Sequence, residues 1–371
     1  MAGGGQTQLA DPLMGQNHFT AVRWGLAGIV ALGHVWLLTV GPEPLQIHGW
    51  LASYMAVNGF FVLSGLLIAK SLHTRRNLGA YAQSRILRIY PALIVVMVAF
   101  LLVFMPLFSH EDLTGSRFLS AGLYVLKVLA MGDHASLPAH IYADNLETVF
   151  NDPLWTIRYE LAAYILAAIA FIFGFVNGRI RVLMTYLAVQ SAYVYFATAH
   201  QDSDLHVNLM PMLRLSSSFL LGMLLWHWRE FRRPPIWAIA GLATLFGLFG
   251  GSFLGEVFAN WALTAIILRL GLPKKANARI AGIPDYSYGI YIWHFPVMQS
   301  LLVWQSDLNP LTLLAVSTPV YLSIAALSWH FIEKPALAFK TAPQIRDRKS
   351  KTLASQAQTL SPASSIEGDA Q

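Results

Sequence analysis

The stretch FTAVRWGLAGIVALGHVWLLTV, residues 19–40, decides the class of fold, because it is long and apolar enough to cross a membrane. It nevertheless carries Arg23 and His34, eleven residues apart. At 100° per residue this spacing brings both side chains to one helix face, roughly 16 Å apart along the axis. Ionisable residues inside a membrane helix usually face the protein interior or a water-filled cavity. The stretch therefore predicts a polar path through a membrane protein.

The composition of the 371-residue chain supports the same fold class. It is 56% apolar and only 12% charged, against about 25% charged residues in soluble domains, so we expect an all-α integral membrane protein. The absence of cysteine excludes disulfides, thiolate metal sites and a cysteine-linked acyl intermediate. The formal net charge is +6, but the basic residues cluster between hydrophobic runs, as topology signals do. We therefore expect a lipid bilayer as the partner and no nucleic acid.

Apolar segments recur along the chain and predict a polytopic bundle of about ten transmembrane helices. The third is expected to begin with Ile89-Tyr90-Pro91, since proline is tolerated in the first turn of a helix. The ten segments are about 20–40, 51–70, 89–108, 154–175, 182–199, 211–228, 236–251, 254–270, 286–306 and 312–332.

The charges between these segments alternate in sign. Connections such as 70–88 carry only Arg and Lys, whereas those on the opposite side, such as 109–152 and the one with Glu256, are mainly acidic. By the positive-inside rule both termini are expected in the cytoplasm. The middle of the long acidic connection, 118–131, is expected to be a short helix. Flexible tails are predicted at 1–19 and 341–371.

Three polar side chains are expected at one depth. At 1.5 Å per residue, His34 and Glu160 both lie roughly 21 Å from the cytoplasmic face, with Asn58 within a few ångströms of that level. A carboxylate beside a histidine raises its basicity and fixes its tautomer, which suits a general base. The alternative is a buried structural pair, and the pairing itself is inferred from depth alone.

Arginines gather where the predicted helices meet the cytoplasm. Arg23 lies near this interface, where an arginine can simply extend its side chain to water. Its shared face with His34 and the nearby Arg85 and Arg88 favour a ligand instead, because arginine binds phosphate in a bidentate manner. Arg75 is interpreted, like its neighbour, as a topology signal alone.

The remaining candidates have competing structural explanations. Ser64-Gly65 is not part of a G-x-S-x-G motif, so the small residues more simply permit close helix packing. His294 fits either a packed core or a channel wall. Two pairs of histidines are spaced by six residues, which matches no metal-ligand spacing, so we expect no metal; they are His134 with His140 and His200 with His206.

Taken together, these motifs resemble the membrane acyltransferase-3 family, which includes bacterial O-antigen and exopolysaccharide O-acetyltransferases and Nod-factor acetyltransferases. They follow the family's order and cover about 20–340, which is read as one transmembrane domain. The matching motifs are R-x10-H (Arg23, His34), GFFVLSGLLI (59–68), RILRIYP (85–91), LWTIRYE (154–160), YSYGIYIWHFP (286–296) and FIEKP (331–335).

The resemblance implies transfer of an acyl group, usually acetyl from cytoplasmic acetyl-CoA, to a sugar hydroxyl of a lipopolysaccharide, exopolysaccharide or related oligosaccharide at the bacterial inner membrane. In the family the Arg and His of R-x10-H are needed for activity. The resemblance maps R-x10-H onto Arg23 and His34, R-x-x-R onto Arg85 and Arg88, and the S-G motif onto Ser64 and Gly65. Together with the residues singled out above, the expected site comprises Arg23, His34 and Glu160 for catalysis, Arg85, Arg88, Ser64 and Gly65 for the CoA donor, and Asn58, Trp155 and His294 for the carbohydrate acceptor.

The expected mechanism follows from these assignments. The arginines hold the phosphates of acetyl-CoA, and the pantetheine arm runs along the face shared by Arg23 and His34. His34, oriented by Glu160, then deprotonates the acceptor hydroxyl. A direct transfer and a covalent acyl-enzyme are both open. Two other functions are also compatible with intramembrane Arg, His and Glu: a transporter or flippase of a lipid-linked sugar, and an acylase of a peptide or small molecule. The residues identify neither the acceptor nor the oligomeric state.

Overall fold

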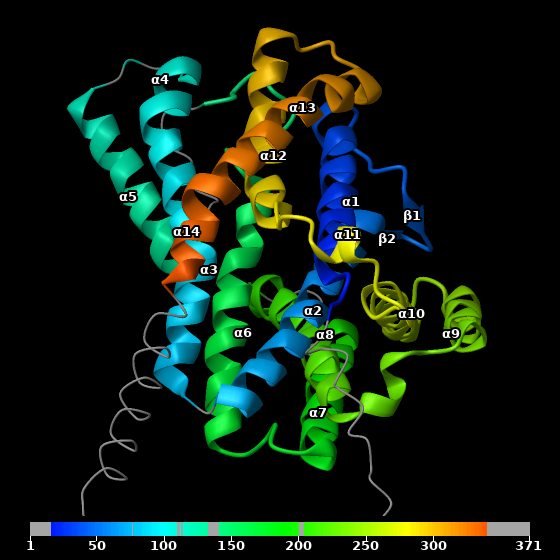
Figure 1. The fold of residues 1–371 in the computed structure, drawn as a ribbon. Helices are drawn as coiled ribbons and strands as arrows, with labels where there is room; N and C mark the ends of the chain where they lie inside the picture. The colour runs from blue at the N-terminus through cyan, green and yellow to red at the C-terminus, as the bar shows by residue number, and fades with distance from the viewer. Residues whose placement is uncertain are drawn as a thin grey trace, which may run out of the picture.

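The computed structural model describes residues 16–75, 77–109, 112, 114–132, 141–199 and 204–339, and these are mostly helical (Figure 1). Within these ranges the only strands are β1 (Gln46–Ile47) and β2 (Trp50–Leu51), which pair antiparallel. The predicted tail 341–371 and most of the predicted tail 1–19 lie outside the described residues.

All ten predicted apolar segments form helices, and seven helical segments in the described ranges are long and apolar enough to cross a membrane. The chain is thus a multi-pass membrane protein, while the count of ten spans stays a prediction. The helices are α1 (Phe19–Thr39), α2 (Ala52–Arg75), α3 (Leu78–Ala99) with its extensions η1 (Phe100–Phe104) and α4 (Met105–Phe108), α5 (Gly115–Met131), η3 (Asp152–Leu154), α6 (Trp155–Ile172), α7 (Arg179–Ala199), α8 (Asp204–His227), η4 (Arg229–Arg232), α9 (Ile236–Phe249), α10 (Phe253–Gly271), α11 (Ala278–Ala281), α12 (Ser287–Trp304), and α13 (Pro310–Ser328) with its extensions η5 (Trp329–Glu333) and α14 (Lys334–Ala338).

The third span begins earlier than expected. Helix α3 begins at Leu78, and the side chain of Asn77 caps it by accepting a 3.0 Å hydrogen bond from the Ala80 amide. Pro91 lies inside this helix, so its predicted place in the first turn is wrong. The RILRIYP motif is therefore helical, which brings Arg85 and Arg88 onto neighbouring turns of a membrane helix.

Helix α5 confirms the short helix expected at 118–131. It lies at one edge of the molecule beside α3 (Figure 1) and packs against α3 and η1. The ring of Tyr124 in α5 contacts Phe100, with 5.0 Å between the ring centroids.

Two glycines allow α2 and α8 to cross in close contact. A Cβ on Gly65 would lie 1.9 Å from the carbonyl oxygen of Phe219, and a Cβ on Gly222 would lie 2.0 Å from that of Val62. Neither position has room for a side chain. These distances support the explanation that Gly65 is small because it permits close packing of two helices.

Helix α12 lies near the centre of the bundle, and most of its residues are buried. It packs against α1 on one side and α13 on another. A Cβ on Gly289 would lie 2.8 Å from Cα of Ala325, so α12 and α13 also approach closely. Because YSYGIYIWHFP runs into this helix, its aromatic residues form part of the core.

Helix α9 shows the opposite environment. It contains no buried residue, and its side chains Trp237 and Leu248 are 77% and 74% exposed. An apolar helix with its side chains on the surface is typical of a face that contacts lipid. Helices α9 and α10 lie together at the edge of the bundle opposite α5 (Figure 1).

The residues from 141 to 154, called here the 141–154 segment, are held against α12 by hydrogen bonds. Asn145 donates through Nδ2 to the side-chain oxygen of Gln299 at 2.7 Å, and Gln299 donates back to the carbonyls of Glu147 and Val149 at 2.6 and 3.0 Å. Asn151 donates to the carbonyl of Ile292 at 2.8 Å. These bonds fix the approach to α6 and bring η3 against the helix core.

Glu256 was expected as a charge in an outer connection, but it lies in the first turn of α10 and is 1% exposed. Tyr54 donates to its Oε1 at 3.1 Å, and Tyr193 donates to its other oxygen. The guanidinium of Arg214 stacks over the Tyr54 ring at 3.4 Å from the centroid. Glu256 therefore belongs to a buried polar network and is not evidence for topology.

Candidate active site

A cavity of about 570 Å³, called here the larger cavity, lies among α1, α2, α3, α6 and α12. Charged and hydroxyl side chains line much of its wall, beside aromatic ones. The charged and hydroxyl-bearing lining residues are Arg23, Ser64, Lys70, Ser71, Ser84, Arg85, Arg88, Thr156, Glu160, Tyr164, Asp285, Ser287, Tyr288 and Tyr291. Five of the predicted site residues therefore line this one cavity, although they come from helices far apart in the sequence. They are Arg23, Ser64, Arg85, Arg88 and Glu160.

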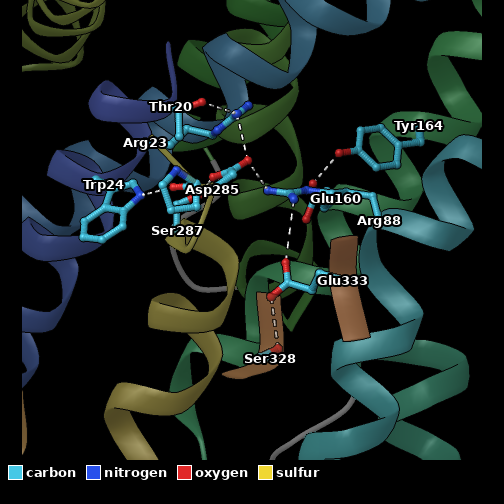
Figure 2. A network of polar contacts seen from close by, with 11 residues as sticks. Thr20, Arg23, Trp24, Arg88, Glu160, Tyr164, Asp285, Ser287, Ser328 and Glu333 are labelled. Atoms are coloured by element: carbon cyan, nitrogen blue, oxygen red, sulfur yellow. Dashed lines mark hydrogen bonds and ion pairs between the residues drawn. The ribbon is translucent and has the colours of Figure 1, made fainter. Parts of the chain in front are cut away.

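Two of the predicted arginines share one carboxylate (Figure 2). Arg23 and Arg88 both donate to Oδ2 of Asp285, at 2.8 and 2.9 Å, and Arg88 lies 3.7 Å from Oε2 of Glu333. Ser287 donates to Oδ1 of Asp285 at 2.6 Å. Two cations and two anions are therefore compensated in place, which lowers the cost of burying them.

Asp285 is held in position from both sides of its loop. The indole Nε1 of Trp24 donates to the carbonyl of Pro284 at 3.0 Å, which ties the loop to α1. Burial alone would raise the pKa of Asp285, but the guanidiniums of Arg88 and Arg23 lower it below its usual value. Asp285 is therefore ionised at neutral pH and links α1 to α3.

Arg85 differs from the other two arginines. Its Nε donates to Oγ of Ser84 at 3.1 Å, and its guanidinium lies 5.5 Å from the centroid of the Tyr164 ring. No carboxylate of the described residues lies within ion-pair distance of Arg85. Its charge is therefore available to an anion that enters the larger cavity.

The predicted contact between His34 and Glu160 is not made. Glu160 lies in the larger cavity, where Tyr164 donates a hydrogen bond to its Oε1 (Figure 2). His34 lines a different cavity and contacts other residues. The estimate of equal depth carried no information on the direction in which each helix faces, so the pairing was wrong.

A second cavity of about 350 Å³, called here the smaller cavity, contains His34. Its wall includes Glu43, Asp152 and Trp155, and it shares Val57 and Tyr291 with the larger cavity. The two cavities therefore adjoin at these two side chains. Arg23 and His34, on one face of α1, line the larger and the smaller cavity respectively.

His34 lies among aromatic rings. Its Nδ1 is 2.8 Å from Nε2 of His294, and the two imidazole rings lie end to end and nearly parallel, with 5.1 Å between centroids and 7° between planes. The Phe295 ring meets His34 edge-on at 5.2 Å. Nε2 of His34 lies 3.8 Å from Oδ2 of Asp152, a residue of the 141–154 segment.

The other predicted site residues separate into three environments. Trp155 lines the smaller cavity and Ser64 the larger one. Gly65 lies at the crossing of α2 and α8 instead of on a cavity wall. Asn58 is fully buried, and His294 is buried behind His34.

Three functional candidates were missed: Asp152, Asp285 and Glu333. Each lies in or beside a motif that the sequence does reveal, since Asp152 precedes LWTIRYE, Asp285 precedes YSYGIYIWHFP and Glu333 is within FIEKP. Asp152 was counted only as an acidic loop residue. In the part of the chain that the structure describes, no three His, Asp or Glu side chains converge as metal ligands.

The fold and its two adjoining cavities define a multi-pass membrane protein that encloses arginines and a histidine within its helix bundle. The family model described as an acyltransferase domain matches residues 18–330. The chain therefore belongs to the acyltransferase-3 family and is an acyltransferase.

Curated relatives agree with this membership. The chain is 23% identical to the O-acetyl transferase of Shigella phage Sf6, over 89% of this chain and 98% of that protein. It is 25% identical to nodulation protein 10 of Rhizobium leguminosarum bv. viciae, over 88% and 95% of the two chains. A third relative, the putative peptidoglycan O-acetyltransferase YrhL of Bacillus subtilis, is 25% identical over 84% of this chain and 54% of its own length. No solved structure shows significant similarity to the chain.

Proposed function

We propose that this acyltransferase moves an acetyl group from acetyl-CoA to a hydroxyl of a carbohydrate acceptor. The observation that carries the proposal is the pair of cavities that adjoin at Val57 and Tyr291. One is lined by arginines that suit the phosphates of CoA, and the other holds a histidine that suits a general base. Three relatives whose names refer to O-acetyl transfer or nodulation support the same reaction class.

The larger cavity is assigned to the donor. Arg85, with no carboxylate partner among the described residues, supplies the principal charge for a phosphate, and Lys70 lies in the same wall. Arg88 and Arg23 keep the site organised through Asp285. Glu160 takes a different role from the expected one and, with Tyr164, offers polar contacts to the donor. Ser64 adds a hydroxyl to this wall.

The smaller cavity is assigned to the acceptor. It combines carboxylates and an amide with aromatic rings, an arrangement that suits sugar hydroxyls and the apolar face of a sugar ring. Glu43, Gln46 and Asp152 supply the polar groups, and Tyr54 and Trp155 supply the rings.

The chemistry then centres on His34. Its Nε2 takes the proton of the acceptor hydroxyl while the oxygen forms a bond to the thioester carbonyl carbon. The carbon–sulfur bond breaks, and the departing thiolate takes the proton from Nε2 and leaves as free CoA. Asp152, at 3.8 Å from Nε2, stabilises the imidazolium that forms between the two transfers.

The orientation in the membrane is also part of the proposal. The larger cavity carries Lys70 of α2 and Arg85 of α3, from the two basic helix ends that meet between Arg75 and Leu78, so we assign it to the cytoplasm of a bacterial inner membrane. The smaller cavity, with Glu43 and Asp152, is assigned to the opposite side. Both termini are then cytoplasmic.

The test compares two donors in purified protein reconstituted in vesicles. Release of free CoA from acetyl-CoA is expected to depend on added glycan. Arg85→Gln should raise KM for acetyl-CoA about tenfold, because it removes one charge-assisted hydrogen bond. It should leave KM for acetyl-pantetheine, which lacks the nucleotide phosphates, unchanged.

The matched control is Arg279→Gln, since Arg279 is exposed and lines neither the larger nor the smaller cavity. It should change neither constant. Glycan transport across the vesicle without CoA release would replace the proposal by the transporter function. An equal effect of Arg85→Gln on both donors would remove the assignment of the phosphates to Arg85.

A further inference from the structure

The hydrogen bonds of the pair His34 and His294 define which ring nitrogens carry protons. Nδ1 of His294 lies 2.9 Å from the carbonyl oxygen of Ile290, one turn earlier in α12. A carbonyl oxygen only accepts hydrogen bonds, so Nδ1 of His294 carries the proton and donates it. In a neutral His294 the other nitrogen, Nε2, is then a bare acceptor.

The position of His294 explains why its imidazole is neutral. It is fully buried, and no carboxylate of the described residues lies within ion-pair distance of it. A buried charge without a partner is costly. The carboxylate nearest to the pair, on Asp152, faces His34.

The tautomer of His294 then determines the tautomer of His34. Nδ1 of His34 lies 2.8 Å from the bare Nε2 of His294, so His34 donates this hydrogen bond. The neutral His34 therefore has its remaining lone pair on Nε2, the nitrogen on the side of Asp152. That is the nitrogen that a general base requires.

We infer that His294 is a positioning residue: the chain of hydrogen bonds from Ile290 through His294 holds His34 in the tautomer whose bare Nε2 serves as the base. Aromatic neighbours limit rotation of both rings, since Phe295 meets His34 edge-on and Tyr321 meets His294 at 76° with 6.3 Å between centroids. This assignment replaces the expected contact of His294 with the acceptor. The catalytic role of this tautomer rests on the proposed function, whereas the tautomer itself follows from the hydrogen bonds alone.

The first experiment reads the tautomer directly and needs no substrate. Protein labelled with ¹⁵N-histidine is examined by NMR in detergent at neutral pH, and the His34 signals are assigned by their loss in His34→Gln. The expected result is a protonated Nδ1 and an unprotonated Nε2. A protonated Nε2 on neutral His34 in the unchanged protein would overturn the inference by itself.

Two substitutions of His294 form the second experiment. His294→Phe keeps a ring but removes the acceptor, so His34 is expected to lose its fixed tautomer and kcat to fall about 100-fold, with KM for acetyl-CoA within twofold. His294→Gln keeps an oxygen that accepts from Nδ1 of His34, so it should retain the tautomer and restore most of kcat. Equal kcat values and an unchanged tautomer in both variants would contradict the positioning role.

The two experiments also separate this inference from the proposed function. The expected tautomer without any glycan-dependent CoA release would leave the hydrogen-bond chain intact and remove the proposed reaction. Glycan-dependent CoA release together with a protonated Nε2 on His34 would support the proposed reaction and overturn the inferred tautomer.

Discussion

The two cavities hold their polar groups by opposite means. In the larger one, Arg23 and Arg88 share the carboxylate of Asp285, so the charges are compensated and fixed. In the smaller one, His34 contacts another imidazole at 2.8 Å, and the carboxylate of Asp152 stays 3.8 Å away. Fixed ion pairs keep a site organised around the charge of Arg85, whereas a histidine with a bare nitrogen suits proton transfer. Under the proposed function, one helix bundle would hold the donor in one cavity and the general base in the other.

The largest expected effect comes from removing the base in the smaller cavity. His34→Ala should lower kcat about 1,000-fold, because general-base catalysis by a positioned side chain contributes factors of this size. KM for acetyl-CoA should stay within twofold, since the donor is assigned to the larger cavity. Glycan-dependent CoA release measures both constants. The control is His330→Ala, an exposed histidine whose loss should leave kcat unchanged; full activity of His34→Ala would end the assignment of His34 as the base.

The larger cavity should respond in stability. Asp285→Asn leaves Arg23 and Arg88 close together without their shared anion, so the free energy of unfolding should fall by about 3 kcal/mol. Unfolding in mixed micelles measures the change. Glu230→Gln is the control, because its 2.7 Å pair with Arg179 is exposed and should contribute under about 1 kcal/mol.

The effect of Asp285 also has a defined pH dependence. Its pKa is lowered by Arg88 and Arg23 against the opposing effect of burial, so its contribution is fully present above the unfolded carboxyl pKa. It is lost as the pH falls through the lower folded value. The stability difference between the unchanged protein and Asp285→Asn should therefore be constant around neutral pH and close under acidic conditions. A difference that grows on acidification would contradict this ion network.

The crossing of α2 and α8 should give a smaller effect. Gly65→Ala places a Cβ against the carbonyl of Phe219, and overpacking of this kind costs about 1–3 kcal/mol. Gly241→Ala in α9 is the control, because nothing lies within 4 Å of its Cβ position. A thermal melt of each variant checks the contrast. If both alanines are equally tolerated, the close contact between α2 and α8 is incorrect.

The smallest expected effect is on the carboxylate opposite the base. Asp152→Asn should lower kcat about tenfold, because an uncharged amide stabilises the imidazolium less well. The stability of the protein should change little, since the Asp152 side chain is 33% exposed. Asp307→Asn, an exposed acidic residue outside both cavities, serves as the control for the assay. An unchanged kcat in Asp152→Asn would show that His34 acts without this carboxylate.

Much of the fold could be predicted because hydrophobic length is a local property. All ten apolar segments form helices, and the helix within the long acidic connection is present as α5. The start of α3 was missed because Lys and Arg between 70 and 88 were interpreted as a loop. Asn77 is nevertheless a typical N-cap residue, and its hydrogen bond to Ala80 shows that a capping signal was available.

The site was predicted less completely, because residue counts give depth along a helix but not the direction in which it faces. His34 and Glu160 were correctly identified as polar residues inside spans, yet they line different cavities. The partners of His34 come from α12 and η3, far away in sequence. Asp285 shows the same limit, since only the folded chain brings it to Arg23 and Arg88.

The shared wall of the cavities has a consequence for the cell as well as for catalysis. Val57 and Tyr291 are both buried, and the Tyr291 hydroxyl lies 3.0 Å from Oγ1 of Thr156, which fixes the ring between the two spaces. With the cavities assigned to opposite sides of the membrane, as proposed, these two side chains would also separate the water on one side from the water on the other, so that protons do not leak through the protein.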